Sequence, residues 1–401
     1  MKDKLGNHIQ QVRGVSYKPN DLSETLSDGY ITLLRANNIS EGKINFDSVQ
    51  FVSSSKVSLE QILKTNDILV CSSSGSLSLV GKSALYKKTG EHTFGAFCKV
   101  VRATGKLLPQ YIAFNMCSQA YRRHIENIAN GANINNLRNE HLDDILLPIP
   151  SETKQNAIIT KLEKVESVIS HRRTQLAKLD ELVKCRFVEM FGDMIYNPNK
   201  WEEKALQSVA DIVSGITKGR KISDTKLIEV PYMSVCNVKD GYIDWTNLKT
   251  ILATNKEIEQ YRILANDVLM TEGGDPDKVG RGAIISSPPN NCIHQNHIFR
   301  VRLSEEVEAI YFEQYLQQPK ARQYFYRSAK QTTGIASINM SQLKAMPVLL
   351  PPLALQEQFA SFVRRIDKLR FVVETSHNHK HFTIYGLAYL YANPRLNLGF
   401  A

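Results

Sequence analysis

An internal repeat, offset by about 200 residues, constrains this 401-residue chain more than any other feature. The run Asn66–Val70 reads NDILV, and its counterpart Asn266–Met270 reads NDVLM. The same offset relates Gly81–Ala84 to Gly280–Ala283, which read GKSA and GRGA. Further matched pairs are Asn38 with Asn237, Gly42 with Gly241, Ile44 with Ile243 and Gln155 with Gln356. Because a repeated sequence is typical of a repeated structural unit, we expect two related domains in tandem.

Each repeat combines short apolar runs, bounded by Gly, Ser and Asn turns, with later helical segments. Strands are predicted at Ile68–Val70, Lys99–Arg102, Val268–Met270 and Ile298–Arg302. Helices are predicted at Pro109–Ile125 and Val307–Tyr324. The expected fold class is therefore α+β, with two tandem mixed α/β domains.

The segment after Pro150 has the clearest helical periodicity in the chain. Its apolar residues follow at alternating intervals of four and three, which is the a/d pattern of a coiled coil. This seam consists of Ile158, Leu162, Val165, Ile169, Leu176, Leu179, Val183 and Met190, interrupted by Arg172 and Arg186. Gly192 is the expected end of the helix. The second repeat has the same spacing at Phe359, Val363, Ile366, Arg370 and Val373.

A helix with one apolar stripe cannot bury that stripe alone. We therefore expect the two long helices to separate the domains and to form an antiparallel coiled coil; the alternative is a long helix packed on its own domain. The predicted boundaries are a first domain at 1–150, a central helical spacer at 151–193, a second domain at 200–350, a second helical spacer at 351–376 and a divergent tail at 377–401.

Composition and charge narrow the class of protein. The formal net charge of +10, from 50 Lys and Arg against 40 Asp and Glu, favours a polyanionic partner. A hydrophobic content of 42% is too high for a disordered chain. No apolar run is long enough to span a membrane, and the polar start lacks a signal core, so we expect a cytoplasmic protein. The six cysteines form no CxxC pair and are interpreted as free thiols.

No catalytic motif is recognisable. The run from Gly75 to Gly81-Lys82-Ser83 has five residues between its glycines, whereas a phosphate loop needs four. The string Asn197–Lys200 lacks the second proline and the aromatic residue of an adenine methyltransferase motif. His294 and His297 have no evident third ligand for a metal. The sequence therefore predicts a non-catalytic chain that binds no metal and no cofactor.

Three features together resemble the specificity subunit of type I restriction–modification systems. The first is the duplicated segment around Asn38 and Asn237. The second is a Leu-Pro motif followed by glutamine, at Leu147–Gln155 and again at Leu350–Gln358. The third is Val183–Asp193, which is similar to the end of the family's central spacer. Their order and double occurrence extend the resemblance to about residue 375.

The resemblance implies that each domain is a target-recognition domain that reads one half of a bipartite, asymmetric site in double-stranded DNA. The spacer helices would fix the gap between the half-sites and would dock two methyltransferase subunits, which use AdoMet. Motor-nuclease subunits that use ATP and magnesium would complete the complex. This chain would bind none of these cofactors.

Matched polar loops are the candidate DNA-contacting segments, because base edges and phosphates are bound by polar and basic side chains. The candidates are Ser73, Ser74 and Lys82 with Lys278 and Arg281, and Asn130 and Asn133 with Gln331, Thr332 and Thr333. The seam residues, including Phe359, Val363 and Ile366, are the candidate spacer and docking residues. Two alternatives remain: a specificity subunit of a related system with a fused methyltransferase-nuclease, and a coiled-coil adaptor that binds no DNA.

The tail departs from the family pattern. After Ser376 the charged, Leu-rich heptads expected of the second spacer are replaced by a His- and Tyr-rich sequence. Gly386 and the β-branched Thr383 and Ile384 lower helix propensity there. We therefore expect the tail to pair poorly and to leave Ile158, Leu162 and Val165 partly exposed.

Overall fold

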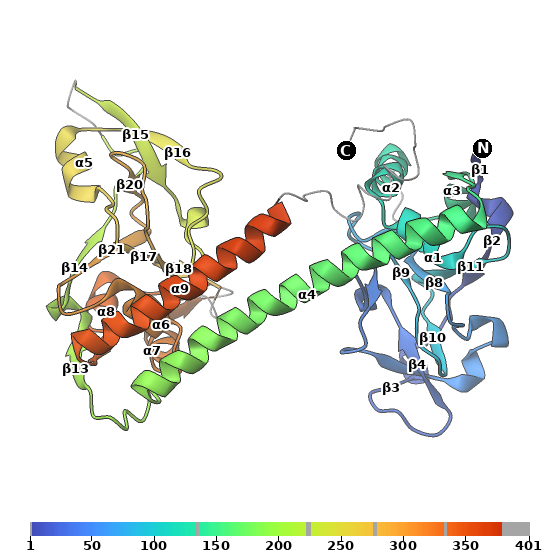
Figure 1. Cartoon of the computed structure of the whole chain (residues 1–401), viewed down its shortest axis with the longest axis horizontal. Coiled ribbons are helices and arrows are strands. Elements are labelled where there is room, and N and C mark those ends of the chain that lie inside the picture. Colours follow the sequence, from blue (N-terminus) through green and yellow to red (C-terminus); the bar gives the residue numbers. More distant parts are fainter. Residues whose placement is uncertain (1, 133–135, 222–225, 276–278, 333–334, 379–401) are drawn as a thin grey trace. The chain divides into compact units, whose positions relative to one another are not determined.

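The computed structural model describes residues 2–132, 136–221, 226–275, 279–332 and 335–378 (Figure 1). The chain divides into two units, Met1–Arg173 and Thr174–Thr375. The long helix α4 (Glu152–Phe191) contributes residues to both units. Among the described helices, none is both long and apolar enough to cross a membrane.

The first unit contains two four-stranded sheets. One is antiparallel, in the order β2-β11-β8-β9: Ile9–Arg13, Cys98–Ala103, Ile68–Cys71 and Ser83–Leu85. The other has the order β10-β4-β7-β3, with β10 and β4 parallel: His92–Phe94, Tyr30–Leu34, Gln50–Ser53 and Leu22–Ser23. Two small pairs complete the strands: β1 with β12 (Lys2–Lys4, Leu146–Pro148) and β5 with β6 (Ile39–Ser40, Lys43–Ile44).

The second unit repeats this topology. Its antiparallel sheet has the order β14-β21-β17-β19: Ala210–Ser214, Ile298–Leu303, Val268–Thr271 and Gly282–Ile284. A three-stranded sheet in the order β16-β15-β20 again has one parallel pair, β15 with β20: Lys249–Ala253, Ile228–Met233 and Ile293–His294. The outer pair is β13 with β24 (Glu202–Ala205, Pro347–Leu350). The predicted duplication is thus a duplication of sheet order.

All four predicted strands are confirmed, as β8, β11, β17 and β21. Each predicted late helix, however, is two helices: α1 and α2 (Pro109–Met116, Gln119–Ala132) and α6 and α7 (Ala309–Leu316, Pro319–Ser328). Pro319 explains the break in the second unit, because proline lacks the N–H that a continuous helix requires. In the first unit Ser118 Oγ accepts a hydrogen bond from Tyr121 N, as a helix-starting residue does. The remaining short helices are α3, α5 and α8 (Asn139–Asp143, Asn255–Tyr261, Met340–Lys344).

A buried glutamine attaches each long helix to its own domain. Gln155 Oε1 accepts from Leu108 N at 2.8 Å, and its Nε2 donates to the Lys106 and Pro150 carbonyls. Gln356 makes the same three bonds, to Glu308 N, the Glu306 carbonyl and the Pro351 carbonyl. Because both side chains are at most 1% exposed, they satisfy backbone groups that water cannot reach. The matched glutamines of the sequence are therefore structural.

Helix α9 (Leu353–Asn378) lies beside the C-terminal half of α4 within the second unit (Figure 1). Phe359 contacts Phe187 and Phe191, and further along α9 Arg370 forms an ion pair with Asp180 at 2.6 Å. As residue numbers rise along α9 they fall along α4, so the two helices are antiparallel here. Phe359, Val363 and Ile366 are buried, as the predicted seam requires.

The buried face of α4 differs from the predicted seam in two respects. At the C-terminal end, Phe187 and Phe191 are 0% exposed, whereas the seam residue Met190 is only half-buried. In the middle, Val165, Ile169, Leu176 and Leu179 are half-buried. The helix meets a globular core at each end as well as another helix, so its deepest residues do not follow one heptad phase.

The predicted exposure of Leu162 is wrong, because this side chain is 1% exposed. Its neighbours Ile158 and Ile159 pack against the core of the first domain. Ile158 and Val165 are half-buried. The tail at 379–401, on which the prediction depended, lies outside the described residues.

The two units differ where α6 carries Glu313, since the matched position in α1 is Ala113. Glu313 Oε1 accepts from Ile284 N at 2.8 Å. Burial raises the pKa of this carboxyl to about 7, from an ordinary value of 4.5, and nearby Asp367 and Asp240 add to the rise. Between pH 4.5 and about 7, Glu313 is therefore mostly protonated in the folded state and mostly ionised in the unfolded chain.

Glu313→Gln should consequently stabilise the second unit at pH 8 by about 1–2 kcal/mol, and much less at pH 5. Above pH 7 the wild-type carboxyl carries a charge that burial disfavours, whereas the amide never does. Urea denaturation at both pH values measures the difference. Glu305→Gln, at an exposed position of the same domain, is the control and should show no such pH dependence. Equal stabilisation at both pH values would contradict the assigned cause.

Candidate nucleic-acid interface

The two predicted polar segments of the second unit lie side by side. Strand β18 (Gly273–Gly274) follows β17 and pairs with β23 (Ile335–Ser337), which pairs with β22 (Lys330–Thr332). Gln331 and Thr332 were expected in a loop, but their backbone belongs to β22, with Gln331 opposite Ala336. Segments some 60 residues apart therefore meet at one end of the central sheet.

The first unit brings its matched segments together in the same way. Ser73 forms an isolated antiparallel bridge with Asn136, and Leu137 N donates to the Ser72 carbonyl at 2.6 Å. Asn130, also expected in a loop, lies in the last turn of α2. Asn133, Lys278 and Thr333 lie outside the described residues.

A hollow of about 590 Å³ opens at this end of the first unit. Ser73 and Ser74, both predicted, line it. Gly75 belongs to the same segment, and the remaining lining comes from three others: Tyr17; Arg35, Ala36 and Asn37; and Gly95, Phe97 and Cys98. An exposed aromatic ring, an arginine and several hydroxyl and amide groups thus surround one concave surface, which is a combination suited to base edges and phosphates.

Lys82 lies elsewhere. It lines a separate hollow of about 530 Å³, together with Gln119 and Arg122. Arg281, its matched residue, is half-buried, and its Nε has no hydrogen-bond partner among the described residues. The two serines follow β8 and line one hollow, whereas Lys82 precedes β9 and lines the other, so its role as a DNA contact stays a prediction.

Phe97 is the member of the hollow that the sequence analysis missed most clearly. Its ring is 67% exposed, although Phe97 directly precedes the buried strand β11. Tyr17, Arg35 and Asn37 were missed because nothing in their local sequence distinguishes them from ordinary surface residues. A comparison of the two repeats offers a signal, since Phe97 and its counterpart His297 differ next to matching strands.

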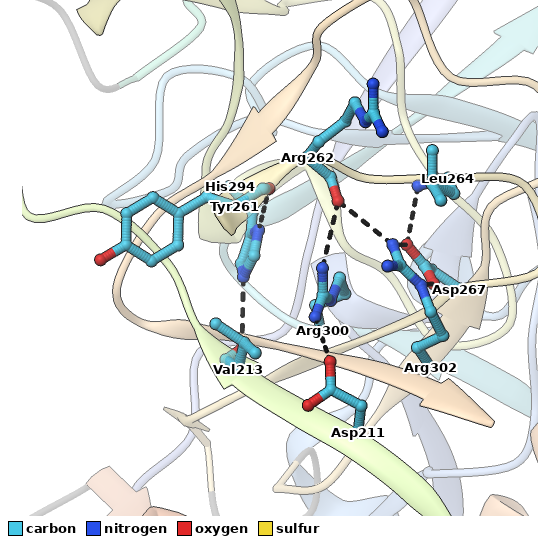
Figure 2. A network of polar contacts seen from close by, with 9 residues as sticks. All are labelled: Asp211, Val213, Tyr261, Arg262, Leu264, Asp267, His294, Arg300 and Arg302. Atoms are coloured by element: carbon cyan, nitrogen blue, oxygen red, sulfur yellow. Dashed lines mark hydrogen bonds and ion pairs between the residues drawn. The ribbon is translucent and has the colours of Figure 1, made fainter. Parts of the chain in front are cut away.

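A polar network holds the equivalent strands of the second unit in place (Figure 2). Asp267 is 1% exposed; its carboxylate accepts two hydrogen bonds from Arg302, each of 2.8 Å, and one from Leu264 N. The first unit has the same bidentate pair at Asp67 and Arg102. Because the aspartate is buried and the pair is duplicated, the pair is interpreted as part of the shared frame.

Arg300 and His294 complete this network without forming a metal or catalytic site. Arg300 donates to Asp211 at 2.5 Å and to the Arg262 carbonyl at 3.3 Å. The His294 ring is fully buried, with Nδ1 at 3.0 Å from the Tyr261 carbonyl and Nε2 at 3.3 Å from the Val213 carbonyl (Figure 2). Burial lowers the pKa of this imidazole to about 4, so it is neutral near pH 7. Throughout the described ranges no three His, Cys, Asp or Glu side chains are grouped as a metal site.

Comparison with known families explains the duplicated frame. The model of the type I restriction modification DNA specificity domain matches this chain twice, at residues 17–181 and 198–379, once for each repeat. This chain belongs to the type I restriction–modification specificity family. Specificity subunits of this family are non-catalytic, which agrees with the absence of catalytic motifs from the sequence.

Relatives and solved structures agree with this assignment. The chain is 29% identical over 376 residues to the type I restriction enzyme EcoKI specificity subunit of Escherichia coli K12, and 30% identical over 381 residues to the StySPI specificity subunit of Salmonella potsdam. Each alignment covers 91% of this chain and 80% of the relative.

The fold is similar to that of the type I restriction–modification S subunit from M. genitalium, with a TM-score of 0.56 and 13% identity over 98% of this chain and 96% of that one. A chain from a structural study of type I R-M complex assembly gives the same TM-score at 16% identity, over 99% of this chain and 98% of that one. The expected fold class of two mixed α/β domains with a long helix is confirmed.

Proposed function

We propose that this chain is the sequence-specific DNA-binding specificity subunit of a type I restriction–modification complex, and that each domain reads one half of a bipartite, asymmetric site. Bases would be contacted in the major groove, and Lys and Arg side chains would bind phosphates. The net charge of +10 is consistent with such a partner.

One observation carries this proposal: the two units share a frame and differ at the same end of it. Sheet order, the Asp–Arg pair and the buried glutamine are all duplicated. The surface beyond β8 and β17 is not, since the first unit presents Ser73, Ser74 and Phe97 where the second presents Gly273, Gly274 and His297. Two domains that bind different half-sites are expected to combine a constant scaffold with a variable surface at the end that contacts DNA.

We further propose that the paired helices form a spacer that docks two methyltransferase subunits, which use AdoMet. In the restriction complex this spacer would also dock motor-nuclease subunits, which use ATP and magnesium. Exposed apolar side chains on both helices, such as Val168, Val188 and Leu369, support a docking role. A related system with a fused methyltransferase-nuclease would use the same spacer. Purification of the chain with its natural partners distinguishes the two arrangements.

Exchange of domain 1–150 for that of a family member with another target tests the two-reader model. Mapping of methylated adenines should show one half of the target changed and the other half intact, because each domain has its own core. Simultaneous alteration of both halves would contradict the model. A gel shift with the cognate methyltransferase subunit addresses the alternative of a coiled-coil adaptor, for which no sequence-specific DNA binding is expected.

A further inference from the structure

The same backbone arrangement holds two different pairs of side chains at the tip of each domain. In the first unit Ser72 N donates to the Phe97 carbonyl at 2.9 Å, and the Ser72 carbonyl accepts from Leu137 N. In the second, Glu272 N donates to the His297 carbonyl at 3.0 Å, and the Glu272 carbonyl accepts from Ile338 N at 2.8 Å. In both domains the N–H and the carbonyl of this residue, Ser72 or Glu272, are therefore held by the same two backbone hydrogen bonds. The side chains differ between the domains.

In the second unit these two side chains, a glutamate and a histidine, contact each other. Glu272 Oε2 lies 2.6 Å from His297 Nδ1, and the two side chains are 34% and 56% exposed. In the first unit the matched Ser72 is buried, and Phe97 projects into solvent at the edge of the 590 Å³ hollow. One tip thus offers an oriented carboxylate, whereas the other offers an aromatic ring.

An ionised carboxylate accepts hydrogen bonds and donates none. In the major groove the groups that donate are the exocyclic amino groups of cytosine and adenine, and Glu and Asp pair with cytosine N4. A carboxylate aimed at a guanine or thymine edge would meet only acceptors. A side chain already held in one orientation loses less conformational freedom on binding than a mobile one.

We propose that Glu272 is a specificity-determining residue of the second domain, which accepts a hydrogen bond from the amino group of a cytosine or adenine in the second half-site, and that His297 is its positioning residue. The proposal rests on the proposed function, since it names the base-edge chemistry that this domain recognises. In the first domain the residue matched to Glu272 is the buried Ser72, and the residue matched to His297 is Phe97, so these two positions provide no oriented carboxylate there.

The test uses the full chain assembled with its methyltransferase subunits. First the target is mapped; then methylation rates are measured on duplexes in which each base pair of the second half-site is replaced in turn. Glu272→Ala should reduce discrimination at one base pair by about ten- to a hundredfold and leave the other positions unchanged. His297→Phe should reduce discrimination at that same base pair, by a smaller factor. Glu305→Ala, at an exposed position beyond the other end of β21, is the matched control and should change nothing.

Each result separates the possibilities. Loss of discrimination confined to one base pair supports the assignment. An unchanged profile, or an equal loss of rate on every duplex, overturns it, because neither indicates a contact to a particular base. A wild-type complex that methylates no bipartite target would contradict the proposed function itself, whatever the variants do. Thermal unfolding of each variant and its co-purification with the methyltransferase show whether it folds. If Glu272→Ala has a folding defect, Glu272→Gln replaces it and should still change discrimination at one base pair only.

Discussion

Phe187→Ala should lower the free energy of unfolding of the second unit by about 3–5 kcal/mol, the largest stability effect that we expect from one substitution. The Phe187 ring is 0% exposed. Its centroid lies 4.8 Å from the ring centroid of Phe191, 5.6 Å from that of Tyr311 and 5.4 Å from that of Phe359. Alanine removes these contacts and leaves a cavity where α4, α6 and α9 meet.

Denaturation by urea, followed by circular dichroism, measures this loss. Val188→Ala is the matched control, because Val188 is the next residue of the same helix and is 50% exposed. Its effect should stay within about 0.5 kcal/mol. Equal destabilisation by the two variants would show that α4 is not anchored through its aromatic face.

Insertion of seven residues after Arg173 should abolish methylation of the natural target. Helix α4 is continuous from Glu152 to Phe191, and it passes from the first unit to the second between Arg173 and Thr174. A heptad adds about 10 Å at 1.5 Å per residue, which corresponds to about three base pairs of DNA. If the helices set the distance between half-sites, the two domains can no longer bind both halves of the natural target at the same time.

Replacement of the seven residues Ser167–Arg173 by another heptad with apolar residues at 169 and 172 provides the control, since it changes the sequence and keeps the length. This variant should methylate the natural target. Mapping of methylated sites in cells that express each variant gives the readout. Continued methylation of the natural target by the insertion variant would rule out a spacer that fixes the gap.

The scaffold was predictable because its signals are local and occur twice. Strands such as β8 and β17 are short apolar runs between turn residues, and Asp67 and Asp267 each precede one of them within a repeated NDxL string. Gln155 and Gln356 stood out at matched positions, although only the structure shows that each satisfies three backbone groups.

The candidate interface was predictable only in part. Ser73 and Ser74 were found because the turn after β8 is polar and recurs in the second repeat. Tyr17, Arg35 and Phe97 come from three other segments, and no periodicity links residues so far apart. Lys82 was placed with the serines because it is near them in sequence, but the turn between β8 and β9 directs it to another opening.

The sequence by itself determined that the chain is duplicated, that each half is a mixed α/β domain and that a long helix follows the first domain. These properties depend on periodicity and on turn residues, which act over a few neighbouring positions. The tertiary structure decided which side chains share a surface and which face of α4 is buried. Phe187 and Phe191 are buried because they belong to the core of the second unit, and Ile159 because it belongs to the core of the first. Burial of this kind arises from segments that fold together across long distances in the chain, and a heptad pattern contains no information about them.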